Sequence, residues 1–401
     1  MILKLDMIQA AALAVIVLFI GKKIKVKLSF LDKYCIPAPV IGGLLFAIIT
    51  LVLKLSNILT FEMDITLQKL FMTAFFTTIG FTASFKLLKK GGKQVFIFLG
   101  LSIILVIMQN LTGITIAKLF GLNPLLGLAT GSVPMVGGHG TAGSFGPILE
   151  KAGAVGATTV AMASATFGLI MGSMIGGPIG KRLIEKKNLL QNMKTVNSNV
   201  TSEIASTKET TGKQLIADDF MNAATQVLLA MGLGTILSNL LEKTGITFPP
   251  YIGAMFAAAI MRNISDATKT YKIYNDEIDV IGNISLSLFL SMALMGLKLW
   301  QLADLALPLI VMLSAQAIIL GIYAYYVVFH IMGKDYESAV ISTGSCGFGM
   351  GATPNAMANM EALTSKFVAA PRAFFIVPLV GSLFIDFFNA GIITMFMNIF
   401  G

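Results

Sequence analysis

Gly137-Gly138-His139-Gly140-Thr141 and Gly347-Phe348-Gly349-Met350-Gly351-Ala352-Thr353 are the two stretches that decide how this chain folds. They occupy matching places in the two halves of a very apolar sequence. Backbone that faces lipid must be helical or part of a closed barrel, so glycine-rich breaks at membrane depth are tolerated only around a protein-lined cavity. Two such breaks in corresponding positions point to a ligand site. We therefore expect the two segments to meet.

The composition is that of a membrane protein. Of the 401 residues, 56% are hydrophobic and 12% are charged, whereas a soluble domain has about 25% charged residues. Apolar stretches recur from end to end, too often for one secretory signal. The alternating ten-residue segments of an outer-membrane barrel are absent. The sequence therefore predicts an all-α polytopic membrane protein, with about ten transmembrane helices in two inverted five-helix repeats that each carry a re-entrant hairpin.

Each predicted repeat contains five spans and one broken hairpin. The N-terminal repeat covers residues 1–180, with its hairpin at about 124–150, and the C-terminal repeat covers residues 215–401, with its hairpin at about 339–362. Residues 181–214 are rich in Ser, Thr and Asn and are expected to form a mobile linker. The predicted spans lie at about 6–21, 36–55, 66–86, 94–118, 152–180, 215–240, 249–262, 278–298, 305–331 and 367–399.

Four features recur in the same order in both halves. The segment 36–43 (Ile-Pro-Ala-Pro-Val-Ile-Gly-Gly) matches 248–254 (Phe-Pro-Pro-Tyr-Ile-Gly-Ala). A Gly-Ser pair precedes each glycine segment, and Gln109 and Gln316 fall at similar places in the preceding spans. Glycine and proline punctuate membrane helices in any case, but four features in one order favour a true repeat.

The basic residues orient the chain in the membrane. With the N-terminus outside, the inner segments 22–33, 86–93, 181–213, 262–272 and 334–372 contain 22 of the 29 Lys and Arg residues. The positive-inside rule then predicts that both termini are outside and that the linker is cytoplasmic. The two hairpins would enter from opposite sides. Because the lysines lie in short loops between spans, the net charge of +9 does not indicate nucleic-acid binding.

A hairpin tip inside the bilayer offers groups that suit both an anion and a cation. Helix N-termini present free N–H donors and partial positive charge to carboxylates, and unwound carbonyls suit sodium. Glycine lets the backbone approach a ligand closely. The predicted substrate-binding residues are Ser132, Gly138, His139, Gly140, Thr141, Ser144, Ser345, Gly351, Thr353, Asn355 and Asn359.

The coupling ion is expected at Asp386, Gly137, Gly349 and Asn389. Asp386 is the carboxylate deepest within a span. Burying a charge there costs free energy, so we expect this residue to have a function. It could ligate sodium, carry a proton or pair with a lysine. Gln109, Asn110, Gln316 and Arg372 are candidates for lining the cavity.

Each of these candidates also has a structural alternative. His139 could be a structural hydrogen-bonding residue, and the asparagines near Pro354 could cap a helix. Interhelical hydrogen bonding is the commonest role of amides such as Gln109 in membrane spans. Arg372 could be a cytoplasmic anchor in place of an attractor for an anionic substrate.

Several absences narrow the mechanism. The sequence has no Gly-x4-Gly-Lys-Ser/Thr loop, so ATP is not expected to drive the process. It has no His-Glu-x-x-His pair, and His139 has no second histidine or cysteine nearby, so no transition metal is expected. Cys35 and Cys346 lack ligand spacing. No regular arginine series marks a voltage sensor. An ion gradient is the remaining energy source.

The Gly-Gly-His-Gly-Thr and Gly-x-Gly-Ala-Thr-Pro motifs resemble those of the bacterial sodium/glutamate symporter family. So do Gln109-Asn110, the loop Met332-Gly333-Lys334-Asp335-Tyr336 and Phe384-Ile385-Asp386. The resemblance covers nearly the whole chain. It implies import of L-glutamate coupled to Na⁺ across the bacterial inner membrane, no other cofactor, and a homodimer.

We therefore expect a secondary transporter, not an enzyme, whose hairpin-bearing domain moves against a static scaffold like an elevator. The nearest alternative is a sodium- or proton-coupled carrier of a di- or tricarboxylate such as malate or citrate. An ion channel is a further alternative, although two opposed closed tips do not resemble one continuous pore. An intramembrane enzyme would need a nucleophile–base pair or a metal site, and the sequence offers neither convincingly.

Overall fold

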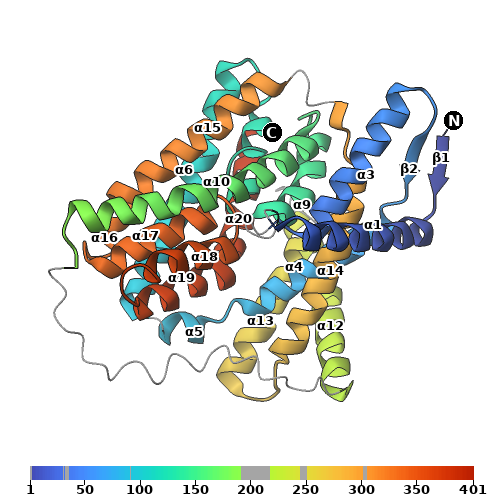
Figure 1. Ribbon diagram of the computed structural model, residues 1–401. Coiled ribbons are helices and arrows are strands. Elements are labelled where there is room, and N and C mark those ends of the chain that lie inside the picture. The colour runs from blue at the N-terminus through green and yellow to red at the C-terminus, as the bar shows by residue number, and fades with distance from the viewer. Residues whose placement is uncertain are drawn as a thin grey trace.

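A computed structural model describes residues 2–29, 31, 36–90, 92–190, 217–243, 251–300 and 305–401. Within these ranges the chain is mostly helical (Figure 1). Seven helices are long and apolar enough to cross a membrane. They are α1 (Met7–Lys27), α3 (Ala38–Leu55), α6 (Gly92–Leu119), α10 (Ala157–Lys186), α12 (Ala217–Glu242), α14 (Asn275–Met295) and α15 (Ala306–Ile322), which continues through the π-helical η4 (Tyr323–Val328) into α16 (Phe329–Ile331).

An eighth span is broken. The helices α19 (Pro371–Leu383) and α20 (Ile385–Phe400) are bent by 44° at Phe384, where the sequence predicts one continuous span. The other two predicted spans correspond to α4 (Thr66–Thr82) and α13 (Tyr251–Thr268). Neither is among the seven, because α4 has only 17 residues and the polar residues Arg262, Asn263 and Asp266 make α13 less apolar.

The remaining helices are short. Pro124, Pro354 and Pro371 lie in the first turns of their helices, where a missing N–H costs nothing. Asp335 begins another helix by accepting a hydrogen bond from the Ser338 N–H at 2.8 Å. The short helices are α5 (Phe85–Lys90), α7 (Pro124–Leu128), α8 (Ser132–Met135), α9 (Gly138–Lys151), α17 (Tyr336–Gly349) and α18 (Thr353–Thr364).

Two short strands depart from the all-helical expectation. β1 (Ile2–Leu5) and β2 (Thr60–Met63) pair in parallel, with Ile2 opposite Thr60. β1 lies just before α1, whose start is fixed by a capping box between Asp6 and Gln9. The strands lie outside the predicted spans. Their pairing therefore provides hydrogen bonds for backbone N–H and C=O groups that belong to none of the predicted helices.

The helices form two groups that lie side by side (Figure 1). We call α1, α3, α4, α12, α13 and α14 the six-helix group, which takes its first three helices from one half of the chain and the others from the second half. We call α6–α10 and α15–α20, including η4, the glycine-segment group, because it contains both glycine segments. The helix α9 also packs against α14, so the first glycine segment lies next to the six-helix group.

Close glycine contacts join two pairs of helices in the six-helix group, α1 with α3 and α12 with α13. A Cβ atom built on Gly42 of α3 would lie 2.0 Å from the Val17 carbonyl oxygen of α1. A Cβ atom built on Gly253 of α13 would lie 2.2 Å from the Gly234 carbonyl oxygen of α12. Gly42 and Gly253 are the residues that the two matching proline-rich segments place in register. Small residues of this kind allow membrane helices to approach closely.

Large apolar side chains are exposed on several long helices. Examples are Ile16 of α1, Ile48 of α3, Ile236 of α12 and Ile318 of α15, each more than half exposed. A soluble monomer rarely exposes such an apolar surface. The chain is therefore a multi-pass helical membrane protein.

Some predictions cannot be compared with these helices. Cys35, most of the linker (191–214) and Phe248-Pro249-Pro250 lie outside the described residues. The described start of the predicted linker is helical, because α10 continues to Lys186.

Candidate functional site

The two glycine segments meet, as the sequence predicts. Gly138 opens α9 with φ of 60°, a left-handed conformation that favours glycine. A Cβ atom built on Gly138 would lie 3.3 Å from the carbonyl oxygen of Gly351, in the break between α17 and α18. The break between α8 and α9 thus touches the break between α17 and α18, although more than 200 residues separate them in the chain.

The helix α10 supports the second glycine segment. Gly168, Gly172, Gly176 and Gly180 recur every fourth residue and therefore share one face of this helix. A Cβ atom on Gly168 would lie 2.5 Å from the Met350 carbonyl oxygen. Built Cβ atoms on Gly176 and Gly180 would similarly collide with side chains of α18 and α17. This stripe lets α17 and α18 lie directly on the backbone of α10.

Two asparagines attach α18 to the same stripe. The side-chain amide of Asn355 donates to the Leu169 carbonyl oxygen at 2.9 Å, and that of Asn359 donates to the Gly172 carbonyl oxygen at 2.8 Å. Asn355 is fully buried. Its Oδ1 atom has no hydrogen-bond partner among the described residues. One end of this amide is thus fixed to α10, and the other end is a buried polar atom whose lack of a partner requires an explanation.

The polar residues of the first glycine segment are also buried. His139 Nε2 lies 3.0 Å from Thr166 Oγ1 of α10. The hydroxyl group of Ser144 donates to the Thr141 carbonyl oxygen at 3.0 Å. Gly140 faces the six-helix group, because a Cβ atom there would lie 3.1 Å from the Phe75 ring of α4. His139 therefore has the structural partner that its alternative interpretation requires.

Gln109 and Gln316 are buried within the glycine-segment group. Gln109 Nε2 donates to the Gly349 carbonyl oxygen at 2.6 Å, and Gln316 Nε2 donates to the Gln109 carbonyl oxygen at 2.8 Å. Both side chains are fully buried, and neither Oε1 atom has a partner among the described residues. The glutamines therefore connect α6, α15 and the end of α17.

Ser132 is held at the start of α8 by two further amides. Its N–H donates to Asn110 Oδ1 at 2.9 Å, and its carbonyl oxygen accepts from Asn389 Nδ2 at 3.2 Å. The Ser132 hydroxyl group, Asn110 Nδ2 and Asn389 Oδ1 have no partner within the described part of the chain. Three predicted site residues from three helices thus surround one short piece of backbone.

Asp386 lies in the first turn of α20, directly after the bend at Phe384. Its carboxylate makes no hydrogen bond or ion pair with another residue in the described ranges, so no lysine neutralises it there. Asn389 lies three residues further on and therefore shares its helix face.

Arg372 lies apart from this cluster, at the start of α19. Its Nη2 atom is 2.7 Å and 2.8 Å from the two carboxylate oxygens of Asp335, and its Nε atom is 3.7 Å from Glu337 Oε2. Burial raises the pKa of Asp335, but hydrogen bonds from Ser338 and the charge of Arg372 outweigh this effect and lower the pKa. Arg372 therefore connects α19 to the start of α17.

Three other predicted residues have backbone or packing roles in this structure. The Ser345 hydroxyl group donates to the Ser342 carbonyl oxygen of its own helix at 2.7 Å. The Gly137 carbonyl oxygen accepts the Thr141 N–H at 3.3 Å. The Thr353 hydroxyl group packs against Gly381 of α19.

Comparison with known proteins identifies the family. The profile of the sodium/glutamate symporter family matches residues 3–369. A protein named sodium/glutamate symporter from Escherichia coli strain K12 is 41% identical over 394 residues, which cover 98% of each chain. The chain belongs to the sodium/glutamate symporter family. A protein of the same name from Haemophilus influenzae is 36% identical over 388 residues, which cover 96% of each chain.

In this member of the sodium/glutamate symporter family, buried polar atoms without a partner gather on the predicted site residues. A buried unpaired polar atom costs free energy, so each one requires an explanation. Apart from Arg372 Nε, which lies 3.7 Å from Glu337 Oε2, six such atoms among the described residues belong to predicted site residues of the glycine-segment group, and five of the six are oxygens. They are Gln109 Oε1, Asn110 Nδ2, Ser132 Oγ, Gln316 Oε1, Asn355 Oδ1 and Asn389 Oδ1.

The helix α10 holds both glycine segments, a role that was not predicted from the sequence. Thr166 contacts His139, and the carbonyl oxygens of Leu169 and Gly172 hold the two asparagines of α18. The regular spacing of Gly168, Gly172, Gly176 and Gly180 was the available signal, because small residues four apart indicate close helix packing in membranes.

Proposed function

We propose that this protein imports L-glutamate together with Na⁺ across the bacterial inner membrane. The relatives reported above carry the name sodium/glutamate symporter and match nearly the whole chain. The observation that carries the proposal is the set of unpaired buried oxygen atoms around two touching glycine segments. Sodium prefers oxygen ligands, and a carboxylate substrate prefers N–H donors at helix starts. The protein would act as a transporter and not as an enzyme.

The substrate would bind at the starts of α9 and α18. Backbone N–H groups near Gly138 and Thr353 lie in the first turns of these helices, where intrahelical partners are missing. Asn355, whose Oδ1 atom is unpaired, would accept a hydrogen bond from the substrate ammonium group. The walls of the site would be formed by Thr141, Ser144, Ser345 and Asn359. The side chains of Ser144, Ser345 and Asn359 donate hydrogen bonds to backbone carbonyl oxygens. The Thr141 side chain lies beside the backbone of Gly137.

Sodium would bind between α8 and the first turn of α20. Asp386 supplies a carboxylate without a cationic partner among the described residues, and Asn389 and Ser132 supply unpaired oxygens. The carbonyl oxygens of Gly137 and Gly349 each accept one hydrogen bond and retain a second lone pair. Each ion would lower the cost of burying the other, because opposite charges attract strongly away from water. Binding of glutamate and sodium would then be coupled.

An inverted repeat with two re-entrant hairpins is part of this proposal. The helices α9 and α17 each have 14 residues and span about 21 Å, less than the ~30 Å hydrocarbon core. The equivalent close contacts at Gly42 and Gly253 support the repeat. Both termini would be outside and the linker cytoplasmic, as the basic residues indicate.

We further propose that the glycine-segment group moves like an elevator against the six-helix group, within a homodimer. The hydrogen bonds that hold Ser132, Gln109, Asn355 and Asn359 all stay within the glycine-segment group. The proposed site could therefore move as a unit. The contact of Gly140 with Phe75 is one of the places where the two groups would separate.

Uptake of radiolabelled L-glutamate into proteoliposomes tests the proposed function. We expect accumulation under an inward sodium gradient and none under a proton gradient alone. Asp386→Asn should reduce accumulation by roughly tenfold or more, because it removes a charged ligand of the ion. Asp218→Asn makes the same chemical change in the exposed first turn of α12 and should leave uptake unchanged.

Two results would contradict the assignment. If sodium drove no glutamate uptake, but malate or citrate accumulated, the protein would be a carrier of di- or tricarboxylates. If sodium crossed the membrane without a substrate and without a fixed stoichiometry, the protein would be a channel.

A further inference from the structure

A groove lies between the two helix groups near α5, beside the bend that precedes Asp386. One part is an apolar slot of about 490 Å³ between α13 and the α19–α20 bend. It is lined by aromatic and aliphatic side chains that include Phe256, Ile260, Phe384, Phe387 and Phe388. The Phe256 and Phe387 rings meet edge to face, with centroids 5.2 Å apart.

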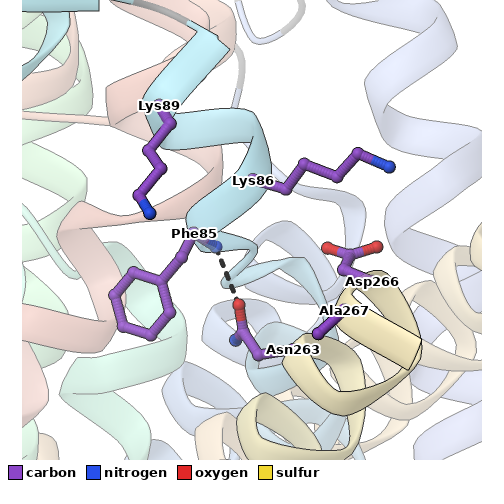
Figure 2. Close-up of a pocket in the computed structure, with 6 residues that line it drawn as sticks. All are labelled: Phe85, Lys86, Lys89, Asn263, Asp266 and Ala267. Carbon is purple, nitrogen blue, oxygen red and sulfur yellow. Dashed lines mark hydrogen bonds between the residues drawn. The ribbon is translucent and has the colours of Figure 1, made fainter. Parts of the chain in front are cut away.

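The second part of the groove is polar and has a volume of about 630 Å³. Phe85, Asn263 and Ala267 line both parts, so the slot and the polar part are continuous. Figure 2 shows Lys86 extending above Asp266, and Lys89 lying on the side of Phe85. The Phe85 N–H donates to Asn263 Oδ1 at 2.9 Å, which fixes α5 against α13.

The polar part of the groove is electropositive. Its carboxylate, Asp266, already accepts a hydrogen bond from Ser84 and lies 3.1 Å from Arg262 Nε. Lys89 makes no ion pair with another residue in the described ranges, and both lysines are exposed. The groove thus combines an apolar slot with two lysines at its mouth. This combination is complementary to an anionic head group attached to an acyl chain.

The position of the groove also matches a lipid. The predicted inner segment 86–93 begins in α5, so under the proposed orientation the lysines lie at the level of the cytoplasmic head groups. Phe85 is 62% exposed and Ile260 is 52% exposed, so the slot is open at its side. An acyl chain could therefore enter from the bilayer without crossing a polar barrier.

We propose that one anionic phospholipid of the inner leaflet binds in this groove. Its phosphate lies at Lys86 and Lys89, and one acyl chain lies between α13 and the α19–α20 bend. The lipid touches both helix groups, since α13 belongs to the six-helix group and α19 and α20 belong to the other. The proposal rests on the bilayer orientation proposed above but not on glutamate as the substrate.

Native mass spectrometry of the detergent-purified full chain tests the proposal. The probes are phosphatidylglycerol and phosphatidylcholine with identical acyl chains. We expect phosphatidylglycerol to bind roughly tenfold or more tightly, because each lysine near a head group contributes about a fivefold preference. The double variant Lys86→Gln/Lys89→Gln should lose this preference. Lys23→Gln/Lys27→Gln removes two exposed lysines of the same predicted side and should keep it.

A second variant tests the slot without changing any charge. Ala267 lines both parts of the groove. Ala267→Trp should fill the junction and abolish the tight binding of phosphatidylglycerol, whereas Ile236→Trp on the exposed face of α12 should not. Thermal unfolding and size-exclusion profiles establish that each variant is folded. If one pair cannot be purified, the other still decides the question.

Three outcomes would overturn the lipid site. Equal binding of the two lipids by the unmodified protein would remove the role of the lysines. Unchanged preference in both groove variants would place the lipid elsewhere. Competition by glycerol phosphate as strong as by the lipid would indicate a plain anion site without an acyl chain. Because the readout is lipid binding, a failure of the glutamate proposal would not produce any of these results.

Discussion

We propose that Asn355 combines a structural role with a ligand contact. Its amide nitrogen is fixed by the Leu169 carbonyl oxygen, and its Oδ1 atom is buried without a partner in the described part of the chain. An asparagine that only capped α18 would not need a fixed, buried and unpaired oxygen. Because the Oδ1 atom is already desolvated before a ligand binds, its desolvation lowers the free energy of unfolding and does not weaken ligand binding. The same argument applies to Asn389 beside Ser132.

At the same scale, Arg372 is predicted to stabilise the fold and not to bind substrate. Its two short hydrogen bonds to Asp335 join α19 to α17. Arg372→Gln should lower the free energy of unfolding by about 1 kcal/mol, a small value because the pair is partly exposed. The KM for glutamate should change by less than about twofold. Thermal unfolding in detergent and uptake kinetics measure the two quantities, and Lys366→Gln is the control at an exposed neighbouring cation.

The pH dependence distinguishes the ion pair from a packing effect. Because the folded protein lowers the pKa of Asp335, this interaction stabilises the fold above the ordinary pKa of about 3.9 and is lost as the pH falls through the folded value. The difference between Arg372→Gln and the unmodified protein should therefore be complete at pH 7 and shrink below about pH 4. A constant difference, or a raised KM, would instead favour packing or attraction of the anionic substrate.

At the scale of elements, the glycine stripe on α10 is predicted to be required for packing. Gly168→Ala would place a methyl group 2.5 Å from the Met350 carbonyl oxygen, so α17 or α10 must shift. We expect a loss of roughly 1–3 kcal/mol in the free energy of unfolding and a lower midpoint in thermal unfolding. Uptake should also fall, because Asn355 and Asn359 bind to carbonyls of the same helix.

Gly177 offers a matched control in the same helix. A Cβ atom on Gly177 would meet nothing within 4 Å outside its own helix. Gly177→Ala should change the free energy of unfolding by less than about 1 kcal/mol, because the higher helix propensity of alanine is offset by the crowding of its Cβ atom against the Pro178 ring. Equal destabilisation by the two substitutions would show that α10 itself, and not its contact with α17, is sensitive.

The sequence patterns predicted where the helices begin and end better than they predicted which residues contact one another. The glycine segments predicted both helix breaks, because glycine and proline act locally on the backbone. The bend at Phe384 was not predicted, since Pro378 lies six residues earlier and the apolar pattern continues through it. The partners of Asn355 and His139 depend on how α10 packs on two distant segments, and no local pattern encodes that contact.

At the scale of the whole molecule, the predicted amides form hydrogen bonds within one helix group, whereas the contacts between the groups are mostly apolar, apart from the Thr82 hydroxyl group, which donates to the Leu383 carbonyl oxygen at 3.3 Å. The described hydrogen bonds of the predicted amides join helices of the glycine-segment group to one another. Toward the six-helix group, Gly140 meets Phe75, Gly143 meets Phe289, and Phe387 meets Phe256. Apolar contacts lack fixed hydrogen-bond geometry, so they can be exchanged for others at lower cost than a network of amides.

The proposed movement predicts that joining the two groups stops transport. In a Cys35→Ser/Cys346→Ser background, Phe256→Cys/Phe387→Cys places a pair across the groups, where the native rings are 5.2 Å apart. Phe46→Cys/Phe61→Cys places a pair within the six-helix region, where the native rings are 5.3 Å apart. Bridging by Hg²⁺ should abolish uptake in the first protein, and excess thiol should restore it. Uptake by the second protein should stay unchanged. Full activity of the bridged first pair would exclude a relative movement of α13 and α20.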